Sequence, residues 1–183
     1  MCTGQYNGRI LVLKNRSIMA LRKNNNGGYD PDVVSKQYGI CSVRTLCAWD
    51  DALLWMDYAG AMMFNVSGVR VTNAKWQQQW KDLSTSQRES AIAVIDRKNR
   101  QYRVAAAGKE YVLDLDDGEW MVMDMADQPV MFAEDVDASG SVNFISNNNL
   151  YKLGDATLHD GSNVNLLYTT NKVRWTSSLL GFP

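Results

Sequence analysis

A hairpin-like unit recurs four times along the chain, and this repeat constrains the fold more than any other feature. Each unit opens with a polar turn, continues into an apolar strand, reverses at a second polar turn and returns through a second strand. The opening turns lie at residues 7–8, 50–51, 96–100 and 137–140. The apolar strands that follow them are predicted at 10–13, 52–56, 101–104 and 141–145. Short apolar runs bounded by turn residues are typical of antiparallel sheets.

A period of roughly 40 to 50 residues built from strands is typical of propeller blades, each of which buries its faces against its neighbours. The sequence therefore predicts an all-β, β-propeller-like repeat of about four blade units in a single domain over 1–183. The propeller closes within the chain, or it is partial and another chain completes it, and the sequence leaves both open. The units are expected near 7–38, 39–72, 90–124 and 130–168, with a tail at 175–183.

Residues 73–89 interrupt the β pattern and predict one short helical insertion. Trp76, Trp80 and Leu83 follow one another at helical spacing, which places them on one face. Asn73 is the candidate N-cap. We take this Trp76/Trp80 helix as a candidate contact surface, because tryptophan contributes strongly to protein interfaces. The alternative is that the two indoles dock the helix on its own domain.

Two further segments are candidate contact surfaces. The loop from Asn24 to Asp32 is rich in asparagine and glycine, and it is expected to be either a contact arm or an ordinary connection between blades. The tail at 175–183 ends without a terminating element. The candidate interface residues of these two segments are Asn24, Asn25, Asn26, Tyr29, Trp175 and Phe182.

Composition narrows the classes of function. The 45% apolar content and six Trp are enough for a core, and thirteen Gly suit a chain of many turns. A net charge of −1 argues against a domain whose main role is gripping nucleic acid, so DNA contact is not indicated. A local basic stripe around Lys14, Arg16, Arg22 and Lys23 stays open beside the alternative of a solvated strand face.

The cysteines and the N-terminus favour folding in a cytoplasm. Cys2, Cys41 and Cys47 are odd in number and lack metal-type spacing, which predicts reduced and buried thiols. The first eight residues are polar and do not form a signal peptide. No run of about 18 apolar residues is present, so no membrane span is expected.

The sharpest local motif is the sequence Asp135-x-Asp137-x-Ser139-Gly140. Alternating oxygen side chains ahead of a glycine turn are how a loop wraps Ca²⁺, but Ser146 stands where the closing carboxylate belongs. The alternative is a hairpin turn with no metal. We therefore expect neither a metal nor a cofactor.

Enzymatic function is not expected from the remaining polar residues. Asp114-x-Asp116-Asp117-Gly118 is a second acidic cluster, which could hold a cation or act in acid–base chemistry, but its strand-turn-strand setting favours a solvated turn. The single histidine, His159, has no matching nucleophile motif, and the chain contains no P-loop, G-x-G-x-x-G or H-E-x-x-H.

The order of motifs resembles a known family. The motifs are the strand pair at 10–21, Gly39-Ile40-Cys41-Ser42, Asp50-Asp51-Ala52-Leu53-Leu54-Trp55-Met56, Gly60-Ala61-Met62-Met63-Phe64, the Trp76/Trp80 helix, Ala93-Val94-Ile95-Asp96, Arg100-Gln101-Tyr102, Tyr111-Val112-Leu113-Asp114-Leu115 with Gly118-Glu119-Trp120, and Leu150-Tyr151-Lys152-Leu153 ahead of Asp160-Gly161. Over residues 9–175 this order is similar to the β-propeller region of tailed-bacteriophage tail-hub or packaged-DNA-stabilisation proteins. These build the nozzle or plug below the portal. Members of the family are usually much longer and share no catalytic residues.

The resemblance implies a non-enzymatic virion component that is made in the host cytoplasm. Its propeller loops would contact portal, adaptor or tail subunits, in a homo-oligomeric ring. Two alternatives remain open. One is a glycan-recognising, receptor-binding propeller, supported by the many Trp and Tyr and by the carboxylates near 114–117 and 135–137. The other is a cellular propeller adaptor that binds peptides.

Overall fold

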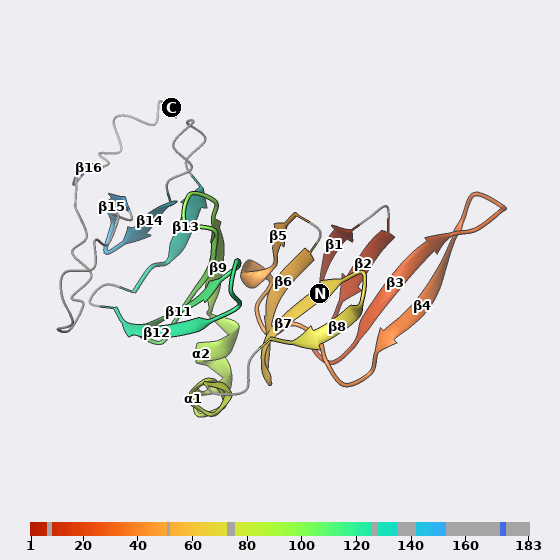
Figure 1. Cartoon of the computed structure of the whole chain (residues 1–183), viewed down its shortest axis with the longest axis horizontal. Helices are drawn as coiled ribbons and strands as arrows, with labels where there is room; N and C mark the ends of the chain where they lie inside the picture. Colours follow the sequence, from red (N-terminus) through yellow and green to blue (C-terminus); the bar gives the residue numbers. More distant parts are fainter. Residues whose placement is uncertain are drawn as a thin grey trace, which may run out of the picture.

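The computed structural model describes residues 1–6, 9–50, 52–72, 76–125, 128–134, 142–152 and 173–174. Four antiparallel sheets of four strands each follow one another along the chain, which confirms the predicted propeller-like repeat. In every sheet the strands are hydrogen-bonded in sequence order. Figure 1 shows the sheets arranged along an open arc, with the first and fourth sheets at its opposite ends.

The strands are short. The first sheet contains β1 (Cys2–Tyr6), β2 (Arg9–Leu13), β3 (Ile18–Lys23) and β4 (Tyr29–Ser35). The second contains β5 (Cys47–Trp49), β6 (Ala52–Asp57), β7 (Gly60–Asn65) and β8 (Gly68–Val71). The third contains β9 (Ile92–Asp96), β10 (Gln101–Ala106), β11 (Lys109–Asp114) and β12 (Trp120–Asp124). The fourth contains β13 (Met131–Glu134), β14 (Val142–Ser146), β15 (Asn149–Lys152) and β16 (Val173–Arg174). Because β9 contacts both β5 and β13, the first strands of consecutive sheets lie side by side, as the inner strands of a propeller do.

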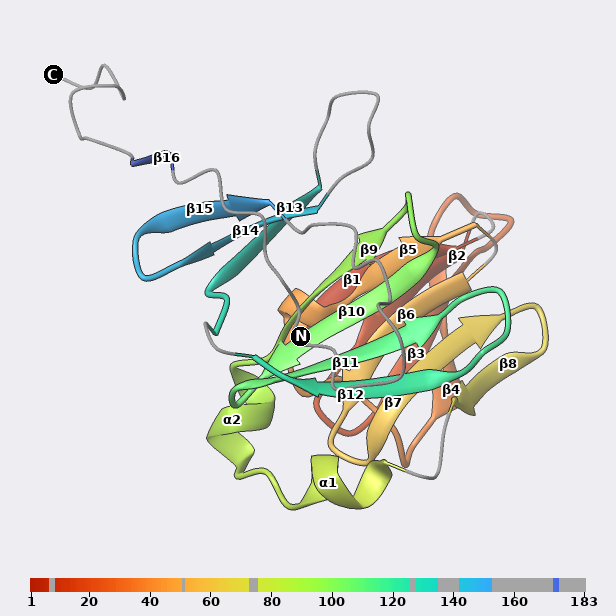
Figure 2. The same cartoon turned by 60° about the vertical axis from the view of Figure 1, so that its left-hand side comes forward.

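Two short α-helices connect the second and third sheets, α1 (Gln77–Lys81) and α2 (Thr85–Glu89). Figure 2 shows both on the same side of the molecule, below the strands of the second and third sheets. Ser84 and Gln87 form a capping box that begins α2, whereas Trp76 occupies the N-cap position of α1. The prediction of Asn73 as N-cap was therefore wrong. Within the described parts of the chain, no helix has the length and apolar character needed to cross a membrane.

Two predicted segments differ from the structure. The unit expected at 39–72 does not open with a strand: Ser42 donates its hydroxyl to the carbonyl of Ala91, a 3-10 helix, η1 (Val43–Thr45), follows, and the first strand is β5. The loop expected from Asn24 to Asp32 ends at Gly28, and β4 begins at Tyr29. Pro31 lies within β4, which is tolerated because β4 is an edge strand of its sheet.

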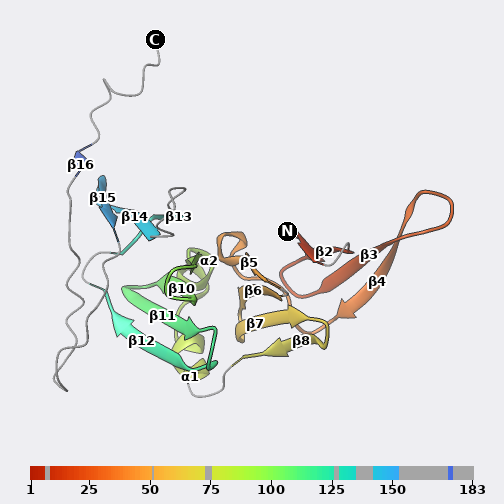
Figure 3. The same cartoon turned by 45° about the horizontal axis from the view of Figure 1, so that its top comes forward.

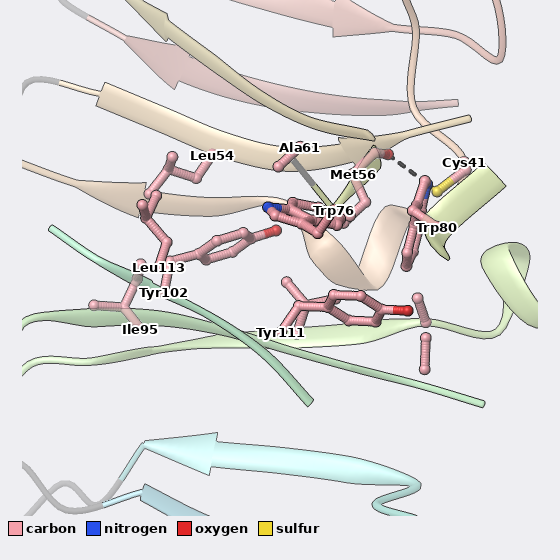
Figure 4. Packing of buried hydrophobic residues seen from close by; sticks show 13 residues of the cluster. Cys41, Leu54, Met56, Ala61, Trp76, Trp80, Ile95, Tyr102, Tyr111 and Leu113 are labelled. Atoms are coloured by element: carbon pink, nitrogen blue, oxygen red, sulfur yellow. Dashed lines mark hydrogen bonds between the residues drawn. The ribbon is translucent and has the colours of Figure 1, made fainter. Parts of the chain in front are cut away.

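The core lies between neighbouring sheets, and β6 shows how the sequence builds it. Leu53 and Trp55 face the first sheet, while Leu54 and Met56 face the third. An apolar run that alternates between two buried faces is what a central layer requires. Figure 4 shows the second of these layers, where side chains from β6 and β7 meet those of β9, β10 and β11.

Candidate protein interface

The first sheet has one covered face and one uncovered face. Leu11, Leu13, Ile18 and Ala20 point toward the second sheet and are buried. The opposite face carries two rows of cross-strand neighbours. These rows are Thr3–Val12–Met19–Val33 and Gln5–Ile10–Leu21–Pro31. We call these eight residues the outer face of the first sheet.

Apart from Thr3 and Gln5, every residue of this outer face is apolar. Ile10, Val12, Met19 and Leu21 are half-buried by their neighbours within the sheet, and Val33 is 51% exposed. Figures 1 and 3 show the sheet at the end of the arc, with this face turned away from the second sheet and no described sheet or helix against it. A contiguous, partly exposed apolar surface of this kind is a candidate interaction site.

A comparison with β6 shows what is missing. From Leu53 to Asp57 every residue of β6 is buried, because sheets pack on both of its faces. In β2 the run Ile10-Leu11-Val12-Leu13 is equally apolar, but burial alternates along it. The sequence of β2 therefore suits a strand covered on both sides, and the described residues cover one side only.

At the other end of the arc, the fourth sheet also has a face on which no described sheet or helix packs. Phe132, Val142 and Phe144 of the fourth sheet pack toward the third sheet. Met131 and Ile145 lie on the opposite face, where Met131 is 56% exposed and Ile145 is half-buried. The strand register continues this row through positions 150 and 173. We call Met131 and Ile145 the outer face of the fourth sheet.

A polar cavity of about 770 Å³ lies between the β6–β7 turn, α2 and the loops at residues 15–16 and 37. Its wall includes Arg16, Tyr58, Arg88 and Glu89. The hydroxyl of Tyr58 donates to Glu89 Oε1 at 2.6 Å, and mainly for this reason the pKa of Tyr58 is raised to about 12. Arg88 donates to the carbonyl oxygen of Tyr58 at 3.0 Å and lies over its ring. These contacts tie α2 to the β6–β7 turn, so the charged groups already serve the fold.

The structure corrects the prediction for the tryptophan helix. Trp80 is 0% exposed and Trp76 is 4% exposed, and both lie in the core between the second and third sheets (Figure 4). The indole N–H of Trp80 donates to the carbonyl oxygen of Asp57 at 2.8 Å, and its ring packs edge-on against Tyr111. Neither indole is accessible to a partner. The alternative, that the two indoles dock the helix on its own domain, is confirmed.

The first part of the predicted loop, residues 24–28, forms the turn of the β3–β4 hairpin, which projects beyond its sheet in Figure 1. Asn24 shapes this turn, because its Oδ1 accepts from the backbone N–H of Gly28 at 2.8 Å and of Asn26 at 3.2 Å. Asn25, Asn26 and Tyr29 are exposed. Other predicted residues lie outside the described part of the chain. These are Asp135, Asp137, Ser139, His159, Trp175 and Phe182.

The acidic cluster at 114–117 is a turn. Asp114 Oδ1 accepts from the backbone N–H of Asp116 at 2.9 Å, and Asp117 Oδ1 accepts from that of Glu119 at 2.7 Å. Asp116 also pairs with Arg100. Over the ranges that the structure describes, no three His, Cys, Asp or Glu side chains are placed to hold a metal ion.

The basic stripe is divided between two ends of one strand. Lys14 and Arg16 lie beside the turn that precedes β3. Arg22 and Lys23 end the same strand, and Arg22 pairs with Asp32 at 2.8 Å. The four residues therefore do not form one continuous positive surface.

Sequence reasoning missed a buried ion network in the third sheet. Arg103 lies 3.3 Å from a carboxylate oxygen of Asp96 and 3.1 Å from one of Glu110, and all three side chains are buried. Arg103 also donates to Gln101 at 2.7 Å. Burial raises the pKa of Glu110, and the nearby Arg103 partly opposes this shift. The only signal in the sequence was a single arginine inside the apolar run of β10.

The aromatic residues behind the glycan alternative mostly build the core. Trp55, Trp76 and Trp80 are buried. Trp49 is half-buried, and its ring is covered by the guanidinium groups of Arg97 and Arg100 at 5.7 and 5.2 Å. None of these four indoles presents the free, flat face on which a sugar ring stacks.

No protein-family model matches the sequence, and no curated protein does. Among solved structures, the chain is similar to the extracellular domain of a one-component system of B. thetaiotaomicron, with a TM-score of 0.55 and 11% identity. It is also similar to the WD40 domain of Neurospora crassa Pan2, with a TM-score of 0.51 and 9% identity. These alignments cover 90% and 91% of this chain but only 23% and 46% of the other two. At such identities the comparison shows the fold alone, a β-propeller arc.

Proposed function

We propose that the chain is a non-enzymatic structural protein of the head-to-tail or tail machinery of a tailed bacteriophage. It joins neighbouring virion subunits through the outer face of the first sheet. The observation that carries the assembly role is the two-row apolar surface on a sheet whose other face is fully packed. The bacteriophage setting is supported by the order of sequence motifs described above.

A protein partner suits this surface better than a small ligand. Val12, Met19 and Leu21 lie on a pleated sheet rather than in a concave pocket. Sheets pack face to face about 10 Å apart through such alternating side chains. Burying apolar surface contributes about 25 cal/mol per Å², so an extended flat contact is needed for useful affinity.

The polar groups at the surface support a scaffold rather than a reaction centre. Tyr58 and Glu89 bond to each other, and Asp114 and Asp117 hold backbone N–H groups of their own turn. Each group is engaged in fixing a turn or a helix, which is what a rigid presenting surface requires.

The test is quantitative mass spectrometry of purified virus particles from the source of the chain, scaled against the portal protein. We expect a small-integer ratio to the portal. Particles carrying Val33→Lys should contain much less of the chain, while Val66→Lys, in the exposed β7–β8 turn, should be incorporated normally. Absence of the wild-type chain from washed particles would contradict the proposal.

A further inference from the structure

We infer that the outer face of the first sheet is covered by the outer face of the fourth sheet of a second copy, so that two chains close into one ring of blades. This inference rests on the proposed function, because it names the partner that the face binds. The contact is head to tail, since two different faces meet. It occurs twice in the ring, once at each junction.

Both faces present apolar side chains from neighbouring strands. The first carries Val12, Met19 and Val33 in one row and Ile10 and Leu21 in the next. The fourth carries Met131 and Ile145, which are cross-strand neighbours. Each of the three junctions inside the chain is already made by apolar side chains of one sheet meeting those of the next. The proposed junction continues that series by the same kind of contact.

Blade number favours two copies. Propellers typically close with about 4–8 blades. The chain supplies four sheets, and Figures 1 and 3 show that they form an open arc whose ends do not meet. A second copy brings the total to eight, which is within the range, whereas a third would exceed it. A ring of two identical arcs has a two-fold axis, and dimers with such an axis are the commonest closed symmetry.

Contact area also favours closure over an open pair. With four strands about 4.8 Å apart and about five residues of 3.4 Å each, one sheet face covers roughly 300 Å². A single junction is therefore in the size range of weak contacts. Two junctions bury roughly 600 Å² of flat area per chain, close to the about 800 Å² per partner of a stable interface.

The experiment measures molar mass by light scattering across a range of protein concentrations. The wild-type chain should have twice its 20.6 kDa mass. Val33→Lys disrupts one face and Met131→Lys the other, and both positions are more than half exposed, so the isolated fold should survive each change. Each variant should show a twofold drop in mass with an unchanged far-UV circular dichroism spectrum. Val66→Lys, at a position 80% exposed and away from both faces, should keep the dimer mass.

Mixing the two variants tests the head-to-tail geometry. The intact fourth sheet of Val33→Lys can meet the intact first sheet of Met131→Lys, so the mixture should form a dimer through one junction, weaker than the wild-type dimer and seen as a rise in mass at the highest concentrations, where neither variant alone rises. Dimeric Met131→Lys beside monomeric Val33→Lys would overturn the inference in favour of a contact between two first sheets, and it would leave the proposed function standing.

A wild-type chain that stays monomeric at every concentration would also overturn the ring. In that case the amount of the Val33→Lys chain in purified virus particles tests the proposed function separately. Reduced incorporation would mean that another virion protein covers the first sheet. Normal incorporation would mean that the proposed function fails as well.

Discussion

Replacing Arg103 with methionine should destabilise the fold more than any other single charge removal in the third sheet. Arg103 is buried and lies within 3.3 Å of Asp96 and 3.1 Å of Glu110. Its loss leaves two buried carboxylates facing each other without a cation. Removing one partner of a buried ion pair typically costs about 3–5 kcal/mol. That is a large part of the roughly 5–15 kcal/mol that holds a domain together.

The matched control is Glu110→Gln, which removes one negative charge and leaves Arg103 paired with Asp96. Because burial already disfavours the charged form of Glu110 and Arg103 keeps Asp96 as a partner, we expect a smaller cost than for Arg103→Met. The double variant Arg103→Met/Glu110→Gln should recover part of the loss, since only one carboxylate is then orphaned.

Urea unfolding followed by tryptophan fluorescence measures all three variants, and the m-values should be equal. The pH dependence of the folding stability is an independent test. The pKa of Glu110 is raised in the folded state above its ordinary value of 4.5, so its contribution to stability is present below that value and is lost as pH rises through the raised pKa. Glu110→Gln should remove this loss. Arg103→Met within 1 kcal/mol of wild type, or a larger loss for Glu110→Gln, would refute the reasoning.

Four further experiments test other parts of the structure. Trp80→Ala should cost about 3–5 kcal/mol in urea unfolding and Trp80→Phe clearly less, because the indole is fully buried; equal and small losses would show that it is not core. Burial raises the pKa of Cys41 to about 12, so a thiol reagent at pH 8 should label it only after unfolding, and rapid labelling of the native chain would contradict the burial. Tyr58 should ionise only near pH 12 by ultraviolet absorbance, and in Glu89→Gln it should ionise at lower pH. Gly39→Ala should be strongly destabilising in a thermal melt, because a Cβ there would overlap the backbone of residues 14 and 15; an unchanged melting temperature would contradict this packing.

The sequence predicted the elements whose pattern is local. The apolar run at 52–56 and the turns around it indicated a strand, and the structure has β6 there, between two sheets. The direction in which the Trp76/Trp80 helix faces was not predictable, because helical spacing fixes one face but not what covers it. The Arg103 network was missed because its carboxylates lie on neighbouring strands, and only the register of β9, β10 and β11 brings them together.

The uncovered faces were also beyond sequence reasoning. Val12 and Leu21 have the identities of core residues, and only the arrangement of the sheets shows that nothing among the described residues packs on them. The predicted segment at 24–32 failed for a different reason. Its Gly, Asn and Pro content signals a turn, yet an edge strand accepts Pro31, so tertiary position overrode local preference.

Because each sheet packs only against the next one, the arc behaves as a linear array with two free ends. The first sheet is held by one neighbour, whereas the second and third are held by two. The free energy of local opening should therefore be lower at the ends of the arc than in its middle. Amide hydrogens in β2 and β3 should exchange faster than those in β6 and β10. A closed ring has no ends. Closure would give every blade two neighbours, turn graded fraying into a single cooperative transition and slow proteolysis at the outer blades.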